Sequence, residues 1–213
     1  MENKNLILVG GGGHCRSVID VAESAGYTIK GILDLPEKVG EKILGYPIIG
    51  SDECIPDFIH EFLFLVTVGH IKDASLRINL HQRILDTGGK LATVIANTAY
   101  VSKYATVGEG TVIMHHAMVN ANAVVGKGCI INTFANIEHE TVIGDYCHIS
   151  TGAMINGNCK IGRGTFIGSQ SVIVNSVEVT EGCVIGAGST VRKNLKQKGI
   201  YSGNPALMKK ILK

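Results

Sequence analysis

Residues 131–155 read INTFANIEHETVIGDYCHISTGAMI, and an aliphatic residue returns at every sixth position of this stretch. The series continues without a slip in both directions, from Ile95 to Val191. Four residues after each member comes a small or slim side chain, and Leu195 closes that second row. A period of six fits neither a 3.6-residue helix nor the alternation of an ordinary strand. It predicts a parallel β-helix, in which each hexad forms one short strand and one turn.

The inward-facing residues explain why this repeat needs many copies. Three hexads are expected to close a triangular coil of 18 residues, with a β-branched side chain pointing inward from each flat side. The second inward position lies near a corner, where Ala, Ser, Thr or Cys fits. One coil cannot bury its own inner face, so only a stack of coils has a core.

Charge and cysteine usage exclude several classes of protein. A net charge of +2 is too small to indicate a nucleic-acid or membrane surface. The six cysteines include no CxxC pair, and Cys129, Cys147, Cys159 and Cys183 occupy the small inward slot, so we expect buried free thiols. The N-terminal run MENKNLILVGGGG is too short in apolar residues for a signal peptide, and no segment approaches a membrane span. We therefore expect a cytoplasmic protein.

The first 94 residues follow a different pattern, in which apolar runs alternate with helical periodicity. Residues 6–9, 29–34 and 61–69 are expected to be buried strands, residues 73–85 an amphipathic helix, and residues 36–50 a loop. This order predicts a small Rossmann-like α/β domain with a doubly wound parallel sheet over residues 1–94. The β-helix would span 95–195, and a cap segment 196–213 would end in a short basic helix at 206–213.

Four glycines, Gly10 to Gly13, directly follow the first expected strand and precede a helix. Free N–H groups and the positive end of the helix dipole then face one spot, as anion binding requires. The fingerprint GxGxxG is only partly met, because Cys15 takes its third glycine position, while Asp34 suits a ribose or nucleobase. We favour a nucleotide-type ligand over a turn that only lets the helix pack on the strand. His14 would contact a phosphate or cap the turn.

His139 is the strongest catalytic candidate inside the repeat. It comes two positions after the inward Ile137, so it should project from a corner, and Glu138 and Glu140 flank it. One carboxylate can orient the ring and raise its basicity, as a general base requires, although an outward histidine is more often merely solvated. Gly157 is 18 residues further on, so its N–H is placed to serve as an oxyanion donor.

Other histidines in the repeat point to a second subunit rather than to a metal. His148 lies half a coil round from His139 and should face a different part of the prism, which suggests that a neighbouring chain completes the site. Positions 18 residues away from His115, His116 and His139 hold no second metal ligand, so a stacked zinc site is not favoured.

The motifs together resemble a known family. The hexads are similar to those of the left-handed β-helix acyltransferases. The loop GGGGH at 10–14, Asn132 followed by IEHE at 137–140, and GNPA at 203–206 resemble one branch of it, the bacterial nucleotide-amino-sugar N-acetyltransferases, which share their fold with sialic-acid O-acetyltransferase-like proteins. The resemblance covers essentially the whole chain and implies a left-handed coil.

The resemblance also implies a homotrimer that holds acetyl-CoA in the groove between two β-helices and uses no metal. His139 would be the general base, Glu140 would raise its basicity, and Asn132 would help to place the acceptor. The positions that match contacts to the nucleotide-sugar are Gly12, Gly13, His14, Asp34, Leu35 and Gly69, and those that match contacts to the coenzyme are His148, Ser169 and Ala187.

Two departures from the family pattern matter. Leu207 stands where a basic residue commonly follows Pro205-Ala206, which leaves the adenine end of the coenzyme site open. No loop interrupts the hexads, so acceptor specificity must come from the N-terminal domain. The alternatives are an O-acetyltransferase acting on a sialic-acid-like sugar and a non-catalytic, sugar-nucleotide-binding trimeric scaffold, against which the IEHE stretch argues. The nucleotide, whether UDP, dTDP or CMP, stays open.

Overall fold

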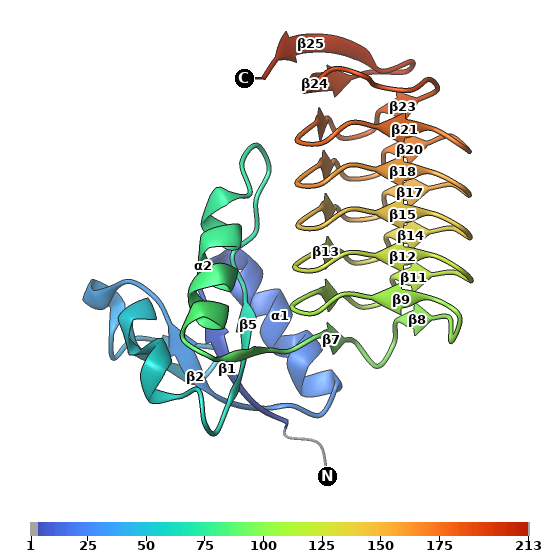
Figure 1. Cartoon of the computed structure of the whole chain (residues 1–213). Helices are drawn as coiled ribbons and strands as arrows, with labels where there is room; N and C mark the ends of the chain where they lie inside the picture. Colours follow the sequence, from blue (N-terminus) through green and yellow to red (C-terminus); the bar gives the residue numbers. More distant parts are fainter. Residues whose placement is uncertain (1–3, 213) are drawn as a thin grey trace.

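A computed structural model describes residues 4–212, and Figure 1 shows an α/β part beside a tall stack of coils. Both parts have the architecture that the sequence predicted, so the expected fold class is confirmed. In the described part of the chain no helix is long and apolar enough to cross a membrane. The cytoplasmic location and the domain boundaries at residues 94 and 195 stay predictions.

The N-terminal part is built on one mainly parallel sheet, in the order β3-β4-β2-β1-β5-β6. Alternate residues of β1 face opposite layers: Leu6 and Leu8 pack with α1, whereas Ile7 and Val9 pack on the side of α2. The sheet is therefore doubly wound. Its elements are β1 (Asn5–Val9), α1 (Gly13–Ser24), β2 (Thr28–Leu33), η1 (Pro36–Lys38), β3 (Lys42–Ile43), β4 (Tyr46–Gly50), η2 (Asp52–Asp57), β5 (Leu63–Val66), α2 (Ser75–Asp86) and β6 (Lys90–Leu91).

The expectation of a loop over residues 36–50 is wrong, because β3 and β4 lie inside this stretch. β4 pairs in parallel with β2, where Ile48 lies opposite Ile32, and Ile48 is only 2% exposed. Pro47 and the glycines around it conceal this strand in the sequence, and burial against β2 outweighs their low strand propensity.

The β-helix begins with β7 and consists of two-residue strands that recur every six residues. Each strand pairs in parallel with the strand 18 residues along, so that Ile131 lies opposite Ile113 and Ile149. Three sheets result. We call them faces C, D and E, in the order in which their first strands occur in the chain. Face C contains β7 (Val94–Ile95), β10 (Val112–Ile113), β13 (Ile130–Ile131), β16 (His148–Ile149), β19 (Phe166–Ile167) and β22 (Val184–Ile185). Face D contains β8 (Tyr100–Val101), β11 (Met118–Val119), β14 (Asn136–Ile137), β17 (Met154–Ile155), β20 (Val172–Ile173) and β23 (Thr190–Val191), and face E contains β9 (Thr106–Val107), β12 (Val124–Val125), β15 (Val142–Ile143), β18 (Lys160–Ile161) and β21 (Glu178–Val179).

Small polar side chains inside the coils satisfy turn carbonyls of the neighbouring coil. Thr111 Oγ1 donates to the Gly126 carbonyl at 2.8 Å, and Cys147 Sγ lies 3.1 Å from the Gly162 carbonyl. A buried hydroxyl therefore has its hydrogen-bond partner and costs little. All six cysteines are free, and the four in the small inward slot, Cys129, Cys147, Cys159 and Cys183, are buried as the repeat predicted.

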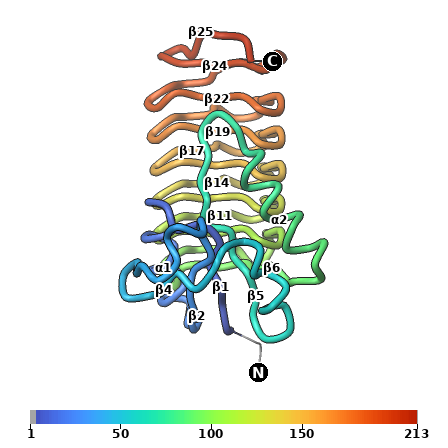
Figure 2. The backbone as a smooth tube through the Cα atoms, turned by 90° about the vertical axis from the view of Figure 1, so that its left-hand side faces the viewer, coloured from blue at the N-terminus to red at the C-terminus, as the bar shows by residue number. Residues whose placement is uncertain are grey.

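The N-terminal part covers the lower half of face C (Figure 2). Val94, Val112 and Ile130 on this face join the apolar cluster beneath α1. The segment between β5 and α2 rises along the same face, so residues at the end of β5 are brought close to the middle coils. This docking determines which parts of the two domains share a site.

The C-terminal cap is a hairpin, and the expected short basic helix over residues 206–213 is wrong. β24 (Gly199–Ser202) pairs in parallel with β22, and β25 (Leu207–Ile211) pairs antiparallel with β24. Lys213 lies outside the described residues. The two strands continue face C, so backbone groups of the last coil have hydrogen-bond partners. A helix at this position would leave those groups without partners.

Neighbouring residues of one short strand should differ sharply in their contribution to stability. Ile161 points inward on β18 and is 2% exposed, whereas Lys160 points outward. Ile161→Ala should lower the free energy of unfolding by about 2–5 kcal/mol because it leaves a cavity between coils. Lys160→Ala, the matched control, should have little effect. Denaturant unfolding of both variants measures this, and equal losses would contradict the inward assignment.

Candidate active site

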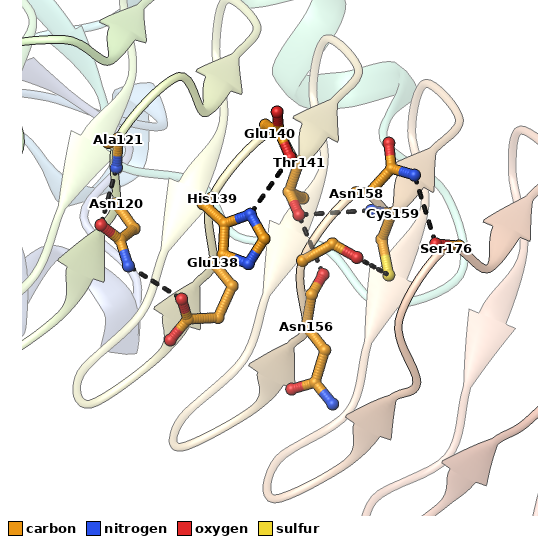
Figure 3. A network of polar contacts seen from close by, with 11 residues as sticks. Asn120, Ala121, Glu138, His139, Glu140, Thr141, Asn156, Asn158, Cys159 and Ser176 are labelled. Atoms are coloured by element: carbon orange, nitrogen blue, oxygen red, sulfur yellow. Dashed lines mark hydrogen bonds and ion pairs between the residues drawn. The ribbon is translucent and has the colours of Figure 1, made fainter.

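The corner that carries His139 contains the predicted histidine–carboxylate pair (Figure 3). His139 Nδ1 lies 3.3 Å from Glu140 Oε2, and both side chains are more than half exposed. Glu138 is held elsewhere, because the amides of Asn136 and Asn120 donate to its two oxygens at 3.0 and 2.8 Å. These hydrogen bonds, that of Asn136 first, lower the pKa of Glu138. Of the two flanking carboxylates, Glu140 is therefore the one that orients the ring.

Gly157 lies directly against the imidazole, one coil further along. A Cβ at this position would come within 2.6 Å of both Cε1 and Nε2 of His139, so only glycine fits beneath the ring as it stands. Asn158 N donates to the His139 carbonyl at 2.9 Å, which fixes the register of the two turns. Within residues 4–212 the Gly157 N–H donates to no acceptor. A free backbone donor thus adjoins the predicted base.

Asn132 and His148 form a second polar group, on face C. His148 Nδ1 lies 2.8 Å from the His70 carbonyl, and its Nε2 lies 3.3 Å from Asn132 Nδ2. A ring whose Nδ1–H donates to a carbonyl keeps Nε2 as the acceptor. His148 is 9% exposed, and this burial lowers its pKa to about 4. At neutral pH it is an uncharged, oriented imidazole.

Two histidines of the N-terminal part lie around His148. The ring centroids of His14 and His148 are 6.3 Å apart, and those of His70 and His148 are 5.7 Å apart. Burial lowers the pKa of His14 to about 3 and that of His70 to about 4. Sequence reasoning missed His70, although its position directly after Gly69, in the segment that follows β5, was a usable signal. We call His14, His70 and His148 the imidazole cluster.

The glycine loop is shaped by close contacts on one side and is open on the other. Gly10 has a φ of +106°, and a Cβ there would meet Val68 Cγ2 at 2.4 Å. Thr67 Oγ1 donates to the Gly10 carbonyl and so holds the turn. By contrast, no atom lies within 4 Å of a Cβ built on Gly12 or Gly13, at the start of α1. Backbone and helix dipole are thus accessible to an anion.

A hollow of about 130 Å³ lies beside the loop, at the carboxyl ends of β1, β2 and β5. Asp34 and Leu35, both predicted for the nucleotide-sugar, line it, and Lys38 Nζ pairs with Asp34 at 2.9 Å. Ligands of doubly wound sheets bind at this edge, where the connections diverge. Val68, Asp52, Leu76 and Leu80 also line it, and the sequence did not indicate them as site residues.

The predicted residues therefore fall into separate places on one chain. Asn132 and the imidazole cluster lie on the side of the N-terminal part, while His139 lies at the next corner of the coil, seven residues or at most about 23 Å further along. Ser169 lies further along the stack, toward the C-terminal cap, with its Oγ 3.0 Å from Ser150 Oγ. Ala187 is exposed one coil beyond Ser169. Among the described residues no group of three or more His, Cys, Asp or Glu side chains could hold a metal ion.

Comparisons with known proteins match both parts of the chain. The family model for the PglD N-terminal domain matches residues 5–84, and the model for the bacterial transferase hexapeptide matches residues 122–157 and 158–193. A search of curated proteins found no match.

Solved structures match almost the whole chain. The acetyltransferase domain of PglB from Neisseria gonorrhoeae is 30% identical, with a TM-score of 0.89 over 97% of this chain and 100% of that one. A histidine-to-asparagine mutant of perosamine N-acetyltransferase from Caulobacter crescentus, in complex with CoA and GDP-perosamine, is 28% identical, with a TM-score of 0.90 over 96% of each chain.

A β-helix of hexapeptide repeats beside a doubly wound N-terminal domain defines an acyltransferase of the hexapeptide class. The chain belongs to the hexapeptide-repeat acyltransferase superfamily, in the branch of N-acetyltransferases with a PglD N-terminal domain. The family confirms the enzyme class predicted from the sequence, an acetyl-CoA-dependent N-acetyltransferase.

The imidazole cluster should make stability depend on pH. A histidine whose pKa is lower when folded binds fewer protons in the native than in the unfolded state, so its contribution is complete above about pH 6.5 and is lost as the pH falls toward about 4. The free energy of unfolding should therefore fall by at least about 1 kcal/mol between pH 7 and pH 5. His70→Asn should reduce this slope, whereas His60→Asn, at an exposed site, should leave it unchanged. Denaturant unfolding at both pH values measures it, and a flat profile would contradict neutral burial.

Proposed function

We propose that the enzyme transfers the acetyl group of acetyl-CoA to the free amine of a nucleotide-linked amino sugar, such as a UDP-4-amino-4,6-dideoxy-sugar. The observation that carries this proposal is the His139–Glu140 pair, whose ring lies against Gly157 at an open corner. Relatives that cover the chain almost completely support it, since one was solved with acetyl coenzyme A and another with CoA and GDP-perosamine.

The N-terminal domain supplies the acceptor site in this proposal. The sugar's diphosphate lies at Gly12 and Gly13, which are exposed at the start of α1. The nucleobase occupies the hollow beside Asp34 and Leu35. His14 and Gly69, which are neighbours because a Cβ built on Gly69 would come within 3.9 Å of His14, then lie between the diphosphate and the sugar. The sugar itself extends toward Asn132 on face C.

The chemistry proceeds by direct attack. Glu140 accepts the Nδ1–H of His139, which leaves Nε2 free to take a proton from the amine as the nitrogen attacks the thioester carbonyl. The Gly157 N–H donates to the oxyanion that forms, and the C–S bond then breaks to release CoA as the thiol after protonation. The inward-facing cysteines of the β-helix lie inside its core, so we expect no acyl-enzyme.

Two chains are needed to assemble this site. On one chain Asn132 follows β13 and His139 follows β14, so the two lie at different corners, and the N-terminal part packs on face C. Packing of β-helices side by side in a homotrimer brings the His139 corner of one copy against the Asn132 side of the next. Acetyl-CoA then lies in the groove between the copies, along His148, Ser169 and Ala187.

Thiol release from acetyl-CoA with a panel of 4-amino nucleotide-sugars tests the reaction. We expect turnover with one or more members of the panel, and with no sialic-acid-like acceptor that offers only hydroxyls. Tight nucleotide-sugar binding without thiol release would instead favour a binding scaffold. UDP, dTDP, CMP and GDP members of the panel identify the nucleotide.

His139→Ala should lower kcat roughly 10²- to 10⁴-fold, the usual contribution of proton transfer, because it removes the general base. Binding of acetyl-CoA, measured by calorimetry, should survive. The matched control is His60→Ala, an exposed histidine outside the site. Near-normal turnover of the His139 variant would show that another group takes the proton.

Gly157→Ala should lower kcat at least about tenfold, because its methyl group displaces the imidazole from its place over the turn. In a His139→Ala background the same substitution should cost much less, since the ring is already absent. Steady-state kinetics of the four proteins in this double-mutant cycle measure the coupling. Additive losses would mean that Gly157 does not act through the ring.

A further inference from the structure

An exposed phenylalanine lies two residues after Asn132, at the corner between faces C and D. The side chain of Phe134 is 60% exposed. Its ring stacks on the imidazole of His116, which lies one coil nearer the start of the β-helix, with centroids 4.9 Å apart and an angle of 18° between the planes. One face of the phenyl ring is thus covered and the other is open. A flat apolar surface therefore adjoins the residue that is expected to place the acceptor.

The turns beneath this pair, which we call the aromatic platform, hold it in place. Phe134 N donates to the His115 carbonyl at 3.2 Å, and His116 N donates to Thr98 Oγ1 at 3.3 Å. The His115 ring lies between the coils and α1, because its Nδ1 is 2.7 Å from Thr98 Oγ1 and its Nε2 is 3.2 Å from Asp20 Oδ2. The platform is thus tied to the helix that begins at the glycine loop.

The open face of the Phe134 ring points away from His116, toward the next coil. The residue 18 positions after Phe134 is Gly152, which has no side chain to lay over the ring. Within residues 4–212, a Cβ built on Gly152 would meet only Gln170 Cγ, at 3.5 Å. The glycine therefore leaves this face of the ring accessible.

The platform lies at the height of the neighbour's catalytic base in the proposed homotrimer. Cyclic symmetry about an axis parallel to the stack keeps equivalent residues of all copies at one height. Since paired strands 18 residues apart are separated by about 4.8 Å, His139, five residues after Phe134, lies only about 1.3 Å further along the stack. A sugar whose amine meets His139 of the neighbouring copy, and which also reaches Asn132, therefore crosses the open face of Phe134.

We propose that Phe134 is a specificity-determining residue, whose open ring face packs against C6 of the acceptor sugar and selects a 6-deoxy sugar. The inference rests on the proposed function, because it assigns a further residue to the same acceptor site. A methyl group at C6 gains apolar contact with the ring. A 6-hydroxyl in the same place loses its hydrogen bonds to water and finds no partner on the ring. His116 acts as a positioning residue, since it supports the ring without touching the sugar.

The test compares UDP-4-amino-4,6-dideoxyglucose with UDP-4-amino-4-deoxyglucose, which differs only by its 6-hydroxyl, or the same pair on the nucleotide that the thiol-release panel selects. The wild-type kcat/KM should be roughly 10- to 100-fold higher for the 6-deoxy sugar, the usual discrimination by an apolar surface against an added hydroxyl. Phe134→Ala should remove most of this preference, mainly by raising the KM for the 6-deoxy sugar, and should leave the KM for acetyl-CoA unchanged. Phe134→Leu, which keeps an apolar group, should retain part of the preference.

Val124→Ala is the matched control, since it shortens an exposed apolar side chain on face E, opposite this corner, and should leave the preference unchanged. A wild-type ratio near one, or a ratio that survives Phe134→Ala, would overturn the assignment. An equal loss with both sugars, together with a smaller oligomer by size-exclusion chromatography, would also overturn it, because the ring would then only hold the copies together.

Calorimetric binding of the two sugars without acetyl-CoA makes the same comparison in the absence of turnover. A preference for the 6-deoxy sugar that Phe134→Ala removes would support the assignment even if no thiol were released from acetyl-CoA. Failure of the sugar preference is therefore distinguishable from failure of the proposed reaction.

Discussion

Parallel pairing of inward aliphatic residues every 18 positions is the constraint on which the rest of the structure depends. Ile131, Ile149 and Ile167 stack on one face with no exposed surface, and equivalent rows run along the other two faces. Because a slip by one residue would turn every inward side chain out, the register is fixed along the whole stack. The same register places Gly157 beneath the His139 ring, so the geometry of the base follows from the packing of the core.

A second constraint is the docking of the N-terminal domain on face C. Arg77 of α2 is fully buried, and it donates from Nε to the Gly128 carbonyl at 2.8 Å and from Nη1 to the Val68 carbonyl at 2.9 Å. Burial lowers its pKa to about 10, yet the guanidinium stays charged at neutral pH. A buried cation is tolerated only when its donors are paired, so these carbonyls from both domains hold the end of β5 against the coils. His70 thereby reaches His148.

Sequence reasoning reached the β-helix, its 18-residue register and the His139–Glu140 pair because a strict repeat translates directly into stacked positions. It failed where tertiary pairing decides the outcome. β4 and β25 are strands because β2 and β24 offer them an edge, which neither local pattern reveals. His70 was missed because its place beside His148 depends on how the two domains dock, which the spacing of residues along the chain does not encode. Asp52 was missed because it reaches the hollow only through the tertiary packing of the N-terminal domain.

The central claim is that each active site combines the His139 corner of one copy with the Asn132 side of its neighbour. Co-expression of His139→Ala and Asn132→Ala chains, followed by purification of the mixed oligomer, tests it most directly. Each variant alone lacks one half of every site, whereas a mixed trimer has interfaces at which both halves are intact. We predict acetyl transfer by the mixed oligomer well above that of either parent. Activity no higher than that of the parents, in oligomers shown to contain both chains, would contradict the shared site.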